Sequence, residues 1–174
     1  MKNTKNNAPD LLWAPWRMEY ILRPKPEAES GCVFCTKAEK NEDEKNLILY
    51  RGETVFVIMN LYPYNNGHIM VVPYRHISSY GEMTEAERHE MSDITAVCLD
   101  ILGEKLYPGG FNVGLNLGRA AGAGIDDHIH QHIVPRWDGD TNFMPVLGHT
   151  KVLVDGLKET WSVLKKAFEE YERK

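Results

Sequence analysis

Three histidines alternate with other residues in the segment His128 to Val134, which reads His-Ile-His-Gln-His-Ile-Val. Side chains of a β-strand alternate between its two faces, so His128, His130 and His132 would share one face of a strand. Neighbouring imidazoles add little stability, because they repel one another when protonated and lose hydration when buried without partners. They can instead divide the roles of nucleophile, acid and anion binder. The spacing therefore favours a catalytic site over a solvated strand face that carries histidines by chance.

A second candidate site is the cysteine pair in Cys32-Val33-Phe34-Cys35. Two thiols at this spacing supply half of a zinc site, form a redox pair, or occur together by coincidence. The third cysteine, Cys98, falls on the apolar stripe of a predicted helix and is expected to be a core residue. Three cysteines do not make a disulfide framework, so a reducing cytoplasm is the expected setting.

The composition is that of one globular domain: 174 residues, of which 43% are hydrophobic and 26% charged. No apolar run approaches the ~20 residues of a membrane-spanning helix, and the polar first ten residues lack the apolar centre of a secretory signal. The formal net charge of −5 argues against nonspecific nucleic-acid binding. A local cluster of His and Arg can still bind a small anion.

The N-terminal residues differ in composition from the rest of the chain, because they are polar or contain prolines. Residues 1–31 are expected to form an N-terminal extension and linker, in which the aromatic-rich segment 11–22 drapes over a surface and residues 23–31 link it to the domain. Residues 32–174 are expected to form the domain, including a charged loop at 41–45 and a C-terminal helical extension.

Five β-branched runs predict strands at 47–50, 54–59, 68–72, 111–117 and 128–134, with a turn at Asn65-Asn66-Gly67 before the third. Between the third and fourth runs, Thr84 and Glu87 form a capping box for a helix that Pro108-Gly109-Gly110 ends. The apolar stripe of this helix consists of Met91, Ile94, Val97, Cys98, Ile101 and Leu102. A second helix is predicted from the spacing of Leu157, Trp161, Leu164 and Phe168. This order of elements predicts an α+β domain with a mainly antiparallel sheet of about five strands.

The histidine pattern resembles the histidine-triad (HIT) family of nucleotide hydrolases and transferases, and the likeness covers most of residues 32–137. Within that range, residues 56–60, residues 67–73 and Arg75-His76 resemble the family's N-terminal strands. Residues 116–124 resemble its phosphate loop. Three further segments, 12–17, 135–137 and 142–145, are similar to a bacterial branch that includes diadenosine tetraphosphate phosphorylases and hydrolases. The resemblance implies a HIT fold and a homodimer.

The resemblance also implies roles for individual residues. His130 matches the nucleophile that attacks the α-phosphorus, and His132 and His68 match positions that surround the phosphate and hold the tautomer of His130. Substrate contacts are implied for Asn60 at the ribose, for Asn116 at the phosphate or leaving group, for the small residues of the phosphate loop, and for Trp137 as a stacking partner of a purine. The loop positions are Gly122, Ala123 and Gly124. Asn60 could equally form a turn, and Trp137 could be a core or interface aromatic.

Bacterial relatives with the cysteine pair imply a structural zinc ion held by Cys32, Cys35, His76 and His128, with no open position for water. Three departures from the family pattern stand out. Gln131 replaces an apolar residue and should meet a polar partner, or lie on a face that is less deeply buried. Asp126 and Asp127 add negative charge beside the phosphate loop, and Ala123-Gly124 stands where relatives carry a hydroxyl.

The expected function is cleavage of a dinucleoside polyphosphate at the α-phosphate through a nucleotidyl-histidine, resolved by phosphate or water. No organic cofactor, nucleic acid or membrane is expected as a partner. Within the same chemistry, the alternative is a nucleoside phosphoramidate hydrolase. Two other classes remain open: a metal-dependent hydrolase that uses the His-x-His strand, and a zinc-stabilised nucleotide-binding module without catalysis.

Overall fold

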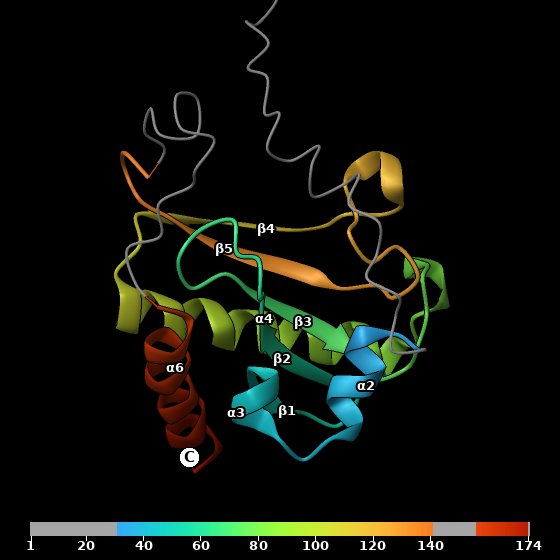
Figure 1. Cartoon of the computed structure of the whole chain (residues 1–174), viewed down its shortest axis with the longest axis horizontal. Helices are drawn as coiled ribbons and strands as arrows, with labels where there is room; N and C mark the ends of the chain where they lie inside the picture. The colour runs from blue at the N-terminus through green and yellow to red at the C-terminus, as the bar shows by residue number, and fades with distance from the viewer. Residues whose placement is uncertain (1–30, 141–155, 174) are drawn as a thin grey trace, which may run out of the picture. The chain divides into compact units, whose positions relative to one another are not determined.

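Within residues 31–140 and 156–173, which the computed structural model describes, five strands form one sheet in the order β1-β2-β3-β5-β4. Each neighbouring pair is antiparallel, so the predicted α+β architecture is confirmed (Figure 1). The strands are β1 Ile48–Arg51, β2 Val55–Met59, β3 Ile69–Pro73, β4 Gly110–Leu115 and β5 Gln131–Arg136. Every residue of β2 and β3 is buried, as their unbroken apolar runs predict.

The histidine segment enters the sheet later than predicted. The strand predicted over 128–134 is β5, Gln131–Arg136, so His128 and His130 precede it. Two hydrogen bonds explain the shift. The Ile129 N–H donates to the Ile77 carbonyl, beyond the end of β3, and the His128 carbonyl accepts from Nδ1 of the His130 ring. The backbone of these residues is therefore engaged outside the ladder, although the side chains still alternate. Gln131 donates to Thr95 on the helix behind the sheet, which is the polar partner that its position predicted.

The predicted long helix is α4, Glu85–Leu106, and it lies behind the strands in Figure 1, in contact with β2, β3 and β5. Its capping box is present, since the Thr84 hydroxyl accepts from the Glu87 N–H and the Glu87 carboxylate accepts from the Thr84 N–H. The helix ends before Tyr107, whose φ of 49° is left-handed, and Pro108 follows. The predicted stripe is buried, except for Val97, which is partly buried against the core.

The predicted C-terminal helix is α6, Leu157–Glu172, which packs on β1 and α4. Leu164 and Phe168 are buried, while Leu157 and Trp161 are partly buried against the core. The Trp161 indole N–H donates to the Ile48 carbonyl, which ties α6 to strand β1. This helix therefore covers the β1 end of the sheet, far along the strand order from β5.

Two short helices lie in segments without a helical pattern. These are α2, Val33–Glu39, and α3, Asp43–Asn46, so the prediction of a loop at 41–45 is wrong in part. Arg51 on β1 explains why they form: it donates to the Asp43 carboxylate and to the carbonyls of Ala38 and Lys40. One or two helical turns held by an arginine on the following strand leave no periodic signal in the sequence.

The aromatic-rich segment 11–22, the linker residues 23–30 and Asn142-Phe143-Met144-Pro145 lie outside the described residues. Among the helices that are described, none is long and apolar enough to span a bilayer.

An ion pair between the half-exposed Arg75 and the buried Glu87 joins the segment that follows β3 to the start of α4. The Glu87 side chain is 3% exposed and accepts from Arg75 Nε at 2.7 Å and from Arg75 Nη2 at 2.8 Å. The hydrogen bonds from Arg75, and to a smaller extent those from Thr84, outweigh burial and lower the pKa of Glu87 to about 2. Arg75 immediately precedes His76, so this pair fixes the backbone beside a predicted metal ligand.

We expect Glu87→Gln to lower the free energy of unfolding at pH 7 by about 1–3 kcal/mol, because a neutral amide is a weaker partner for the guanidinium. The folded-state pKa is depressed, so the contribution of Glu87 is complete above its ordinary pKa of 4.5 and disappears as the pH falls through about 2. Urea unfolding across this range should show the two proteins converging at low pH. Glu85→Gln is the matched control, since that side chain is 80% exposed in the same helical turn. Equal losses in both variants would contradict the assignment.

Candidate active site

The imidazoles of His68, His130 and His132 lie side by side on one face of the sheet. Their ring centroids are 5.1 Å apart for His68 and His132 and 4.8 Å apart for His130 and His132. The three residues are between 0% and 8% exposed. His68 reaches this place from a distant part of the sequence, because β3 pairs with β5 and Met70 lies opposite His132. Gly67 makes the turn into β3 with a φ of 67°, and a Cβ there would clash with the Leu106 side chain.

Backbone and side-chain donors fix the tautomer of His68. Its Nδ1 accepts from the Tyr64 N–H at 3.0 Å, with the amide nitrogen of Asn60 at 3.4 Å, so the proton resides on Nε2. That Nε2 lies 2.9 Å from Nδ1 of His132 and donates to it. His132 must then carry its own proton on Nε2, which lies 3.3 Å from Nδ2 of Asn116. Exchanging the amide nitrogen and oxygen of Asn116 places the oxygen there as the acceptor. The chain of hydrogen bonds therefore links His68, His132 and Asn116 and fixes the tautomers of both rings.

His130 has the opposite tautomer. Its Nδ1 lies 2.8 Å from the His128 carbonyl, which accepts only from an N–H, so the lone pair is on Nε2. Burial lowers the pKa of His130, and it lowers the pKa of His68 to about 3, with smaller contributions from the neighbouring histidines. Both rings are therefore neutral at pH 7. A neutral imidazole with a free nitrogen beside a neighbouring N–H is suited to nucleophilic attack on an electrophile that carries negative oxygens.

Two aromatic residues belong to this site although the sequence patterns did not mark them. Tyr64 places its ring 4.6 Å from the His68 ring and 5.6 Å from the His132 ring. Phe34, from α2, lies 5.0 Å from the His130 ring. The only available signals were the position of Tyr64 four residues before His68 and of Phe34 between the two cysteines. Neither spacing predicts contact with a strand that is about 65 to 95 residues away in the sequence.

The loop after β4 carries the predicted phosphate-binding positions. Asn116 reaches His132, whereas the N–H groups of Gly122 and Ala123 donate to the carbonyls of Arg119 and Gly118 inside the loop. Asp126 forms an ion pair with Arg119 at 2.6 Å, so its charge is opposed locally. An open cleft of about 530 Å³ beside this pair is lined by His76, Ile77, Ser78, Glu82, Arg119, Asp126 and Asp127. Its three carboxylates make it unsuitable for a polyphosphate.

Trp137 lies one residue beyond the end of β5, at the opposite end of the strand from the histidines. Its indole N–H donates to the Tyr107 carbonyl at 3.2 Å. Five residues of extended strand separate it from His132, a span of about 16 Å. Asn60 lies in the histidine cluster, where its side-chain oxygen accepts from the Tyr62 N–H. The structure therefore brings Asn60 and Asn116 to the imidazoles within this chain, and leaves Trp137 apart from them.

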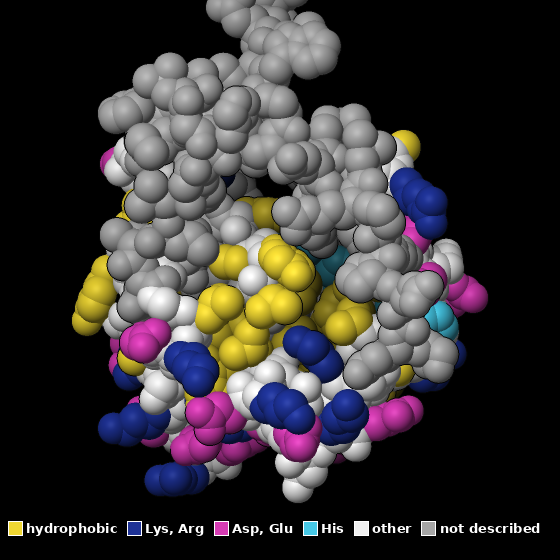
Figure 2. Space-filling view, in the orientation of Figure 1, with side chains coloured by type: hydrophobic (Ala, Val, Ile, Leu, Met, Phe, Trp, Pro, Cys, Tyr) yellow, Lys and Arg dark blue, Asp and Glu magenta, His cyan; other side chains and the backbone are white. Residues whose placement is uncertain are grey.

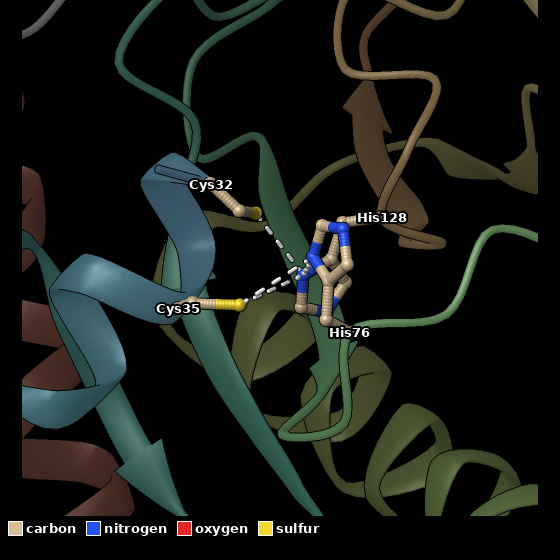
Figure 3. A group of neighbouring side chains, drawn as sticks. All are labelled: Cys32, Cys35, His76 and His128. Carbon is tan, nitrogen blue, oxygen red and sulfur yellow. Dashed lines mark hydrogen bonds between the residues drawn. The ribbon is translucent and has the colours of Figure 1, made fainter. Parts of the chain in front are cut away.

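A second cluster unites the four predicted metal ligands, whose donor atoms all lie within 4.8 Å of one another (Figure 3). Nδ1 of His128 lies 3.2 Å from Sγ of Cys32 and 3.6 Å from Sγ of Cys35. Nδ1 of His76 lies 3.3 Å from Nδ1 of His128 and 3.5 Å from Sγ of Cys35. Ligands of a tetrahedral zinc ion, with Zn–N of about 2.0 Å and Zn–S of about 2.3 Å, are roughly 3.3–3.8 Å apart. The observed spacing fits that shell.

The surroundings of the cluster also suit a cation. Nε2 of His128 donates to the Pro73 carbonyl at 2.9 Å, which leaves Nδ1 with a lone pair directed at the cysteines. Burial, followed by the neighbouring Cys32, raises the pKa of the Cys35 thiol to about 11. A thiol at this position therefore keeps its proton until a cation displaces it. This Cys/His group can bind a metal.

An antiparallel sheet that gathers imidazoles at β5 beside β3 is the architecture of histidine-triad nucleotide enzymes. Residues 41–139 match the HIT domain family. The chain belongs to the histidine-triad (HIT) family and is an enzyme of that family.

Two relatives and one solved structure illustrate the relationship. The chain is 40% identical over 159 residues to the AP-4-A phosphorylase of Mycobacterium tuberculosis, which covers 88% of this chain and 81% of the relative. It is 33% identical over 109 residues to an uncharacterized HIT-like protein of Methanocaldococcus jannaschii, covering 63% of this chain and 81% of that one. Its fold matches the crystal structure of a Zn-bound histidine triad family protein from Mycobacterium smegmatis with a TM-score of 0.65 at 23% identity, over 84% and 99% of the two chains.

Proposed function

We propose that the enzyme cleaves dinucleoside polyphosphates such as diadenosine tetraphosphate at the α-phosphate, through a nucleotidyl intermediate on His130. The observation that carries this proposal is the hydrogen bond from His130 Nδ1 to the His128 carbonyl, which leaves a lone pair on Nε2, with the His132 ring centroid 4.8 Å from that of His130. The relative that is 40% identical over most of both chains is named an AP-4-A phosphorylase. That relative supports the substrate class, and the tautomers support the covalent route.

In the first step, Nε2 of His130 forms a bond to the α-phosphorus as the bond from phosphorus to the bridging oxygen breaks. The bridging oxygen leaves with the remaining nucleotide, which is ATP when the substrate is diadenosine tetraphosphate. The N–H of His132 stabilises the charge on the phosphate oxygens, and His68 holds His132 in the required tautomer. In the second step, phosphate or water attacks the same phosphorus, the P–N bond breaks, and Nε2 regains its lone pair. The products are ADP with phosphate and AMP with water.

Substrate contacts follow from what surrounds the histidines. Asn60 is assigned to the ribose and Asn116 to the phosphate or leaving group. The N–H groups of Gly122 and Ala123 donate to carbonyls inside their own loop. The loop would therefore have to rearrange before these two N–H groups, together with that of Gly124, could bind the phosphate oxygens. The segment 60–67 carries the exposed apolar side chains of Leu61, Tyr62 and Tyr64. Figure 2 shows hydrophobic side chains gathered near the middle of the displayed face, with histidine surface beside them. A nucleobase would find apolar contact on such a surface.

Cys32, Cys35, His76 and His128 would hold a structural zinc ion, for which the donor set and spacing are suitable. With four protein ligands, the ion would supply no open position for substrate, and its contribution would be to stabilise the fold around His128. The thiols favour a reducing compartment such as the cytoplasm.

A homodimer is proposed from the sheet edge at β4. Among residues 31–140 and 156–173, this strand pairs only with β5. Val113 in the strand and Leu117 just after it are about half exposed. An unpaired edge with apolar side chains is stabilised by pairing with a second copy. Trp137, which lies apart from the histidines of its own chain, would then stand near the subunit interface. Sedimentation of the purified chain as a monomer at micromolar concentration would contradict this proposal.

The acceptor is tested by incubating the enzyme with diadenosine tetraphosphate labelled at the α-phosphorus, with and without inorganic phosphate. Label in ADP only when phosphate is present identifies a phosphorylase, and label in AMP under both conditions identifies a hydrolase. Acid-labile label on the protein after rapid quenching supports the covalent route. Turnover without any covalent label would favour a metal-dependent hydrolase, and cleavage of a nucleoside phosphoramidate alone would favour the other HIT chemistry. Binding of the dinucleotide without cleavage would indicate a nucleotide-binding module.

A further inference from the structure

Phe34 connects the cysteine pair to the histidine cluster. It lies on α2 between Cys32 and Cys35 and is 2% exposed. Its ring centroid is 5.4 Å from that of His128, with the planes at 75°, and 5.0 Å from that of His130, with the planes at 52°. Phe34 therefore contacts a predicted metal ligand and the proposed nucleophile at the same time.

The His130 ring needs such a contact to hold its direction. The torsion that turns an imidazole about its Cβ–Cγ bond is broad, so rotamer preference alone orients the ring poorly. One hydrogen bond, from Nδ1 to the His128 carbonyl, and one edge contact, with the His132 ring at 74°, constrain it. Phe34 supplies a further aromatic contact. With these neighbours in place, rotation away from the hydrogen bond to His128 would collide with a packed side chain.

The position of Phe34 is set by the same short helix that presents the two thiols. The sulfurs of Cys32 and Cys35 lie 3.2 and 3.6 Å from Nδ1 of His128, so α2 is held against the segment that carries His130. Figure 3 shows this helix directing both sulfurs toward the paired imidazoles. A seven-residue helix is too short to keep a fixed place without such tertiary contacts.

We propose that Phe34 is a positioning residue for His130: it holds the imidazole so that Nε2 points toward the substrate phosphorus. The inference rests on the proposed function, because it assigns to His130 the role of nucleophile. Phe34 has no group that can react, so it would act only through the His130 ring that it contacts. A displacement of about 1 Å at a nucleophile can cost about 100-fold in rate, so loosening this ring should slow the chemical step more than it weakens binding.

The test is Phe34→Leu, assayed with diadenosine tetraphosphate at saturating inorganic phosphate. We expect kcat to fall about tenfold or more, KM to stay within about twofold, and the metal content to remain that of the unaltered protein. Phe34→Tyr restores the aromatic ring and should keep kcat within about threefold, although its buried hydroxyl lowers the melting temperature. The matched control is Phe168→Leu on α6, a phenylalanine that is 1% exposed and packs beside Tyr50. It should lower the melting temperature and leave kcat within about twofold.

A readout that does not depend on turnover is the nitrogen NMR spectrum of the His130 ring. The unaltered protein should show a protonated Nδ1 and an unprotonated Nε2, and Phe34→Leu should show partly averaged signals, while Phe168→Leu should not. Unchanged kcat and spectra, a rise in KM alone, loss of metal or folding in Phe34→Leu, or equal losses in the Leu and Tyr variants would each overturn the proposal. If the unaltered protein does not cleave the dinucleotide, the proposed function fails, whereas the NMR comparison still reports whether Phe34 orients His130.

Discussion

His130→Ala is expected to lower kcat for diadenosine tetraphosphate by about 10³-fold or more, with KM changed by less than about threefold. The alanine removes the only nitrogen to which the α-phosphorus would bond, so the covalent route is closed and only the electrostatic contribution of His132 and the loop remains. A 10³-fold loss corresponds to about 4 kcal/mol of transition-state stabilisation. Initial rates measured at saturating and limiting dinucleotide separate the effect on kcat from that on KM.

The matched control for this variant is His89→Ala. His89 lies on α4, its side chain is 72% exposed, and it faces Glu85 on the same helix rather than the imidazole cluster. It should retain the activity and the acid-labile label of the unaltered enzyme, whereas His130→Ala should lose both. Retention of a tenth or more of kcat in His130→Ala, in a protein that keeps its metal content, would show that another group attacks the phosphorus.

Loss of the Cys/His cluster should have the largest effect on stability. Purified protein is expected to contain one zinc ion per chain, and Cys35→Ser is expected to lose most of it and to melt about 10 °C lower or more. The reason is that four ligands from three separate segments converge within 4.8 Å, and a bound cation that favours only the folded arrangement adds its binding free energy to folding. For a chain of this size, each kcal/mol changes the melting temperature by about 2–4 °C. Metal analysis and calorimetry measure the two quantities.

Cys98→Ala serves as the control, because Cys98 is fully buried against the core on α4 and lies outside the cluster. It should lower the melting temperature slightly and keep one zinc ion per chain. A chelator should reproduce the loss seen in Cys35→Ser and have no further effect on that variant. Equal metal content in Cys35→Ser and the unaltered protein would rule out Cys35 as a ligand.

Long periodic elements could be predicted from the sequence because their signals are local. The capping box at Thr84 and the stripe from Met91 to Leu102 predicted α4, and the spacing from Leu157 to Phe168 predicted α6. The short helices α2 and α3 could not be predicted, since their formation depends on Arg51, which arrives with β1. The start of β5 was also misplaced, because the backbone of the segment before it bonds outside the ladder.

Some features of the candidate site could likewise be predicted from local spacing, and others could not. The alternating spacing was enough to bring the His130 and His132 rings together, although His130 precedes β5, and the Cys-x-x-Cys spacing was enough to suggest a metal. The tautomers were not accessible from spacing, because they depend on the Tyr64 N–H, the His128 carbonyl and the contact between His68 and His132. The contacts of Phe34 with two histidines required the packing of α2 on the β5 segment.

The sequence by itself determined which groups could do chemistry here and which elements would carry them, since residue type, period and caps act over a few neighbours. Only the tertiary structure decided which ring nitrogen is free, which side chains hold it and which four ligands meet. Those properties depend on contacts between segments that are tens of residues apart, and strand pairing, helix packing and burial create such contacts only in the folded chain.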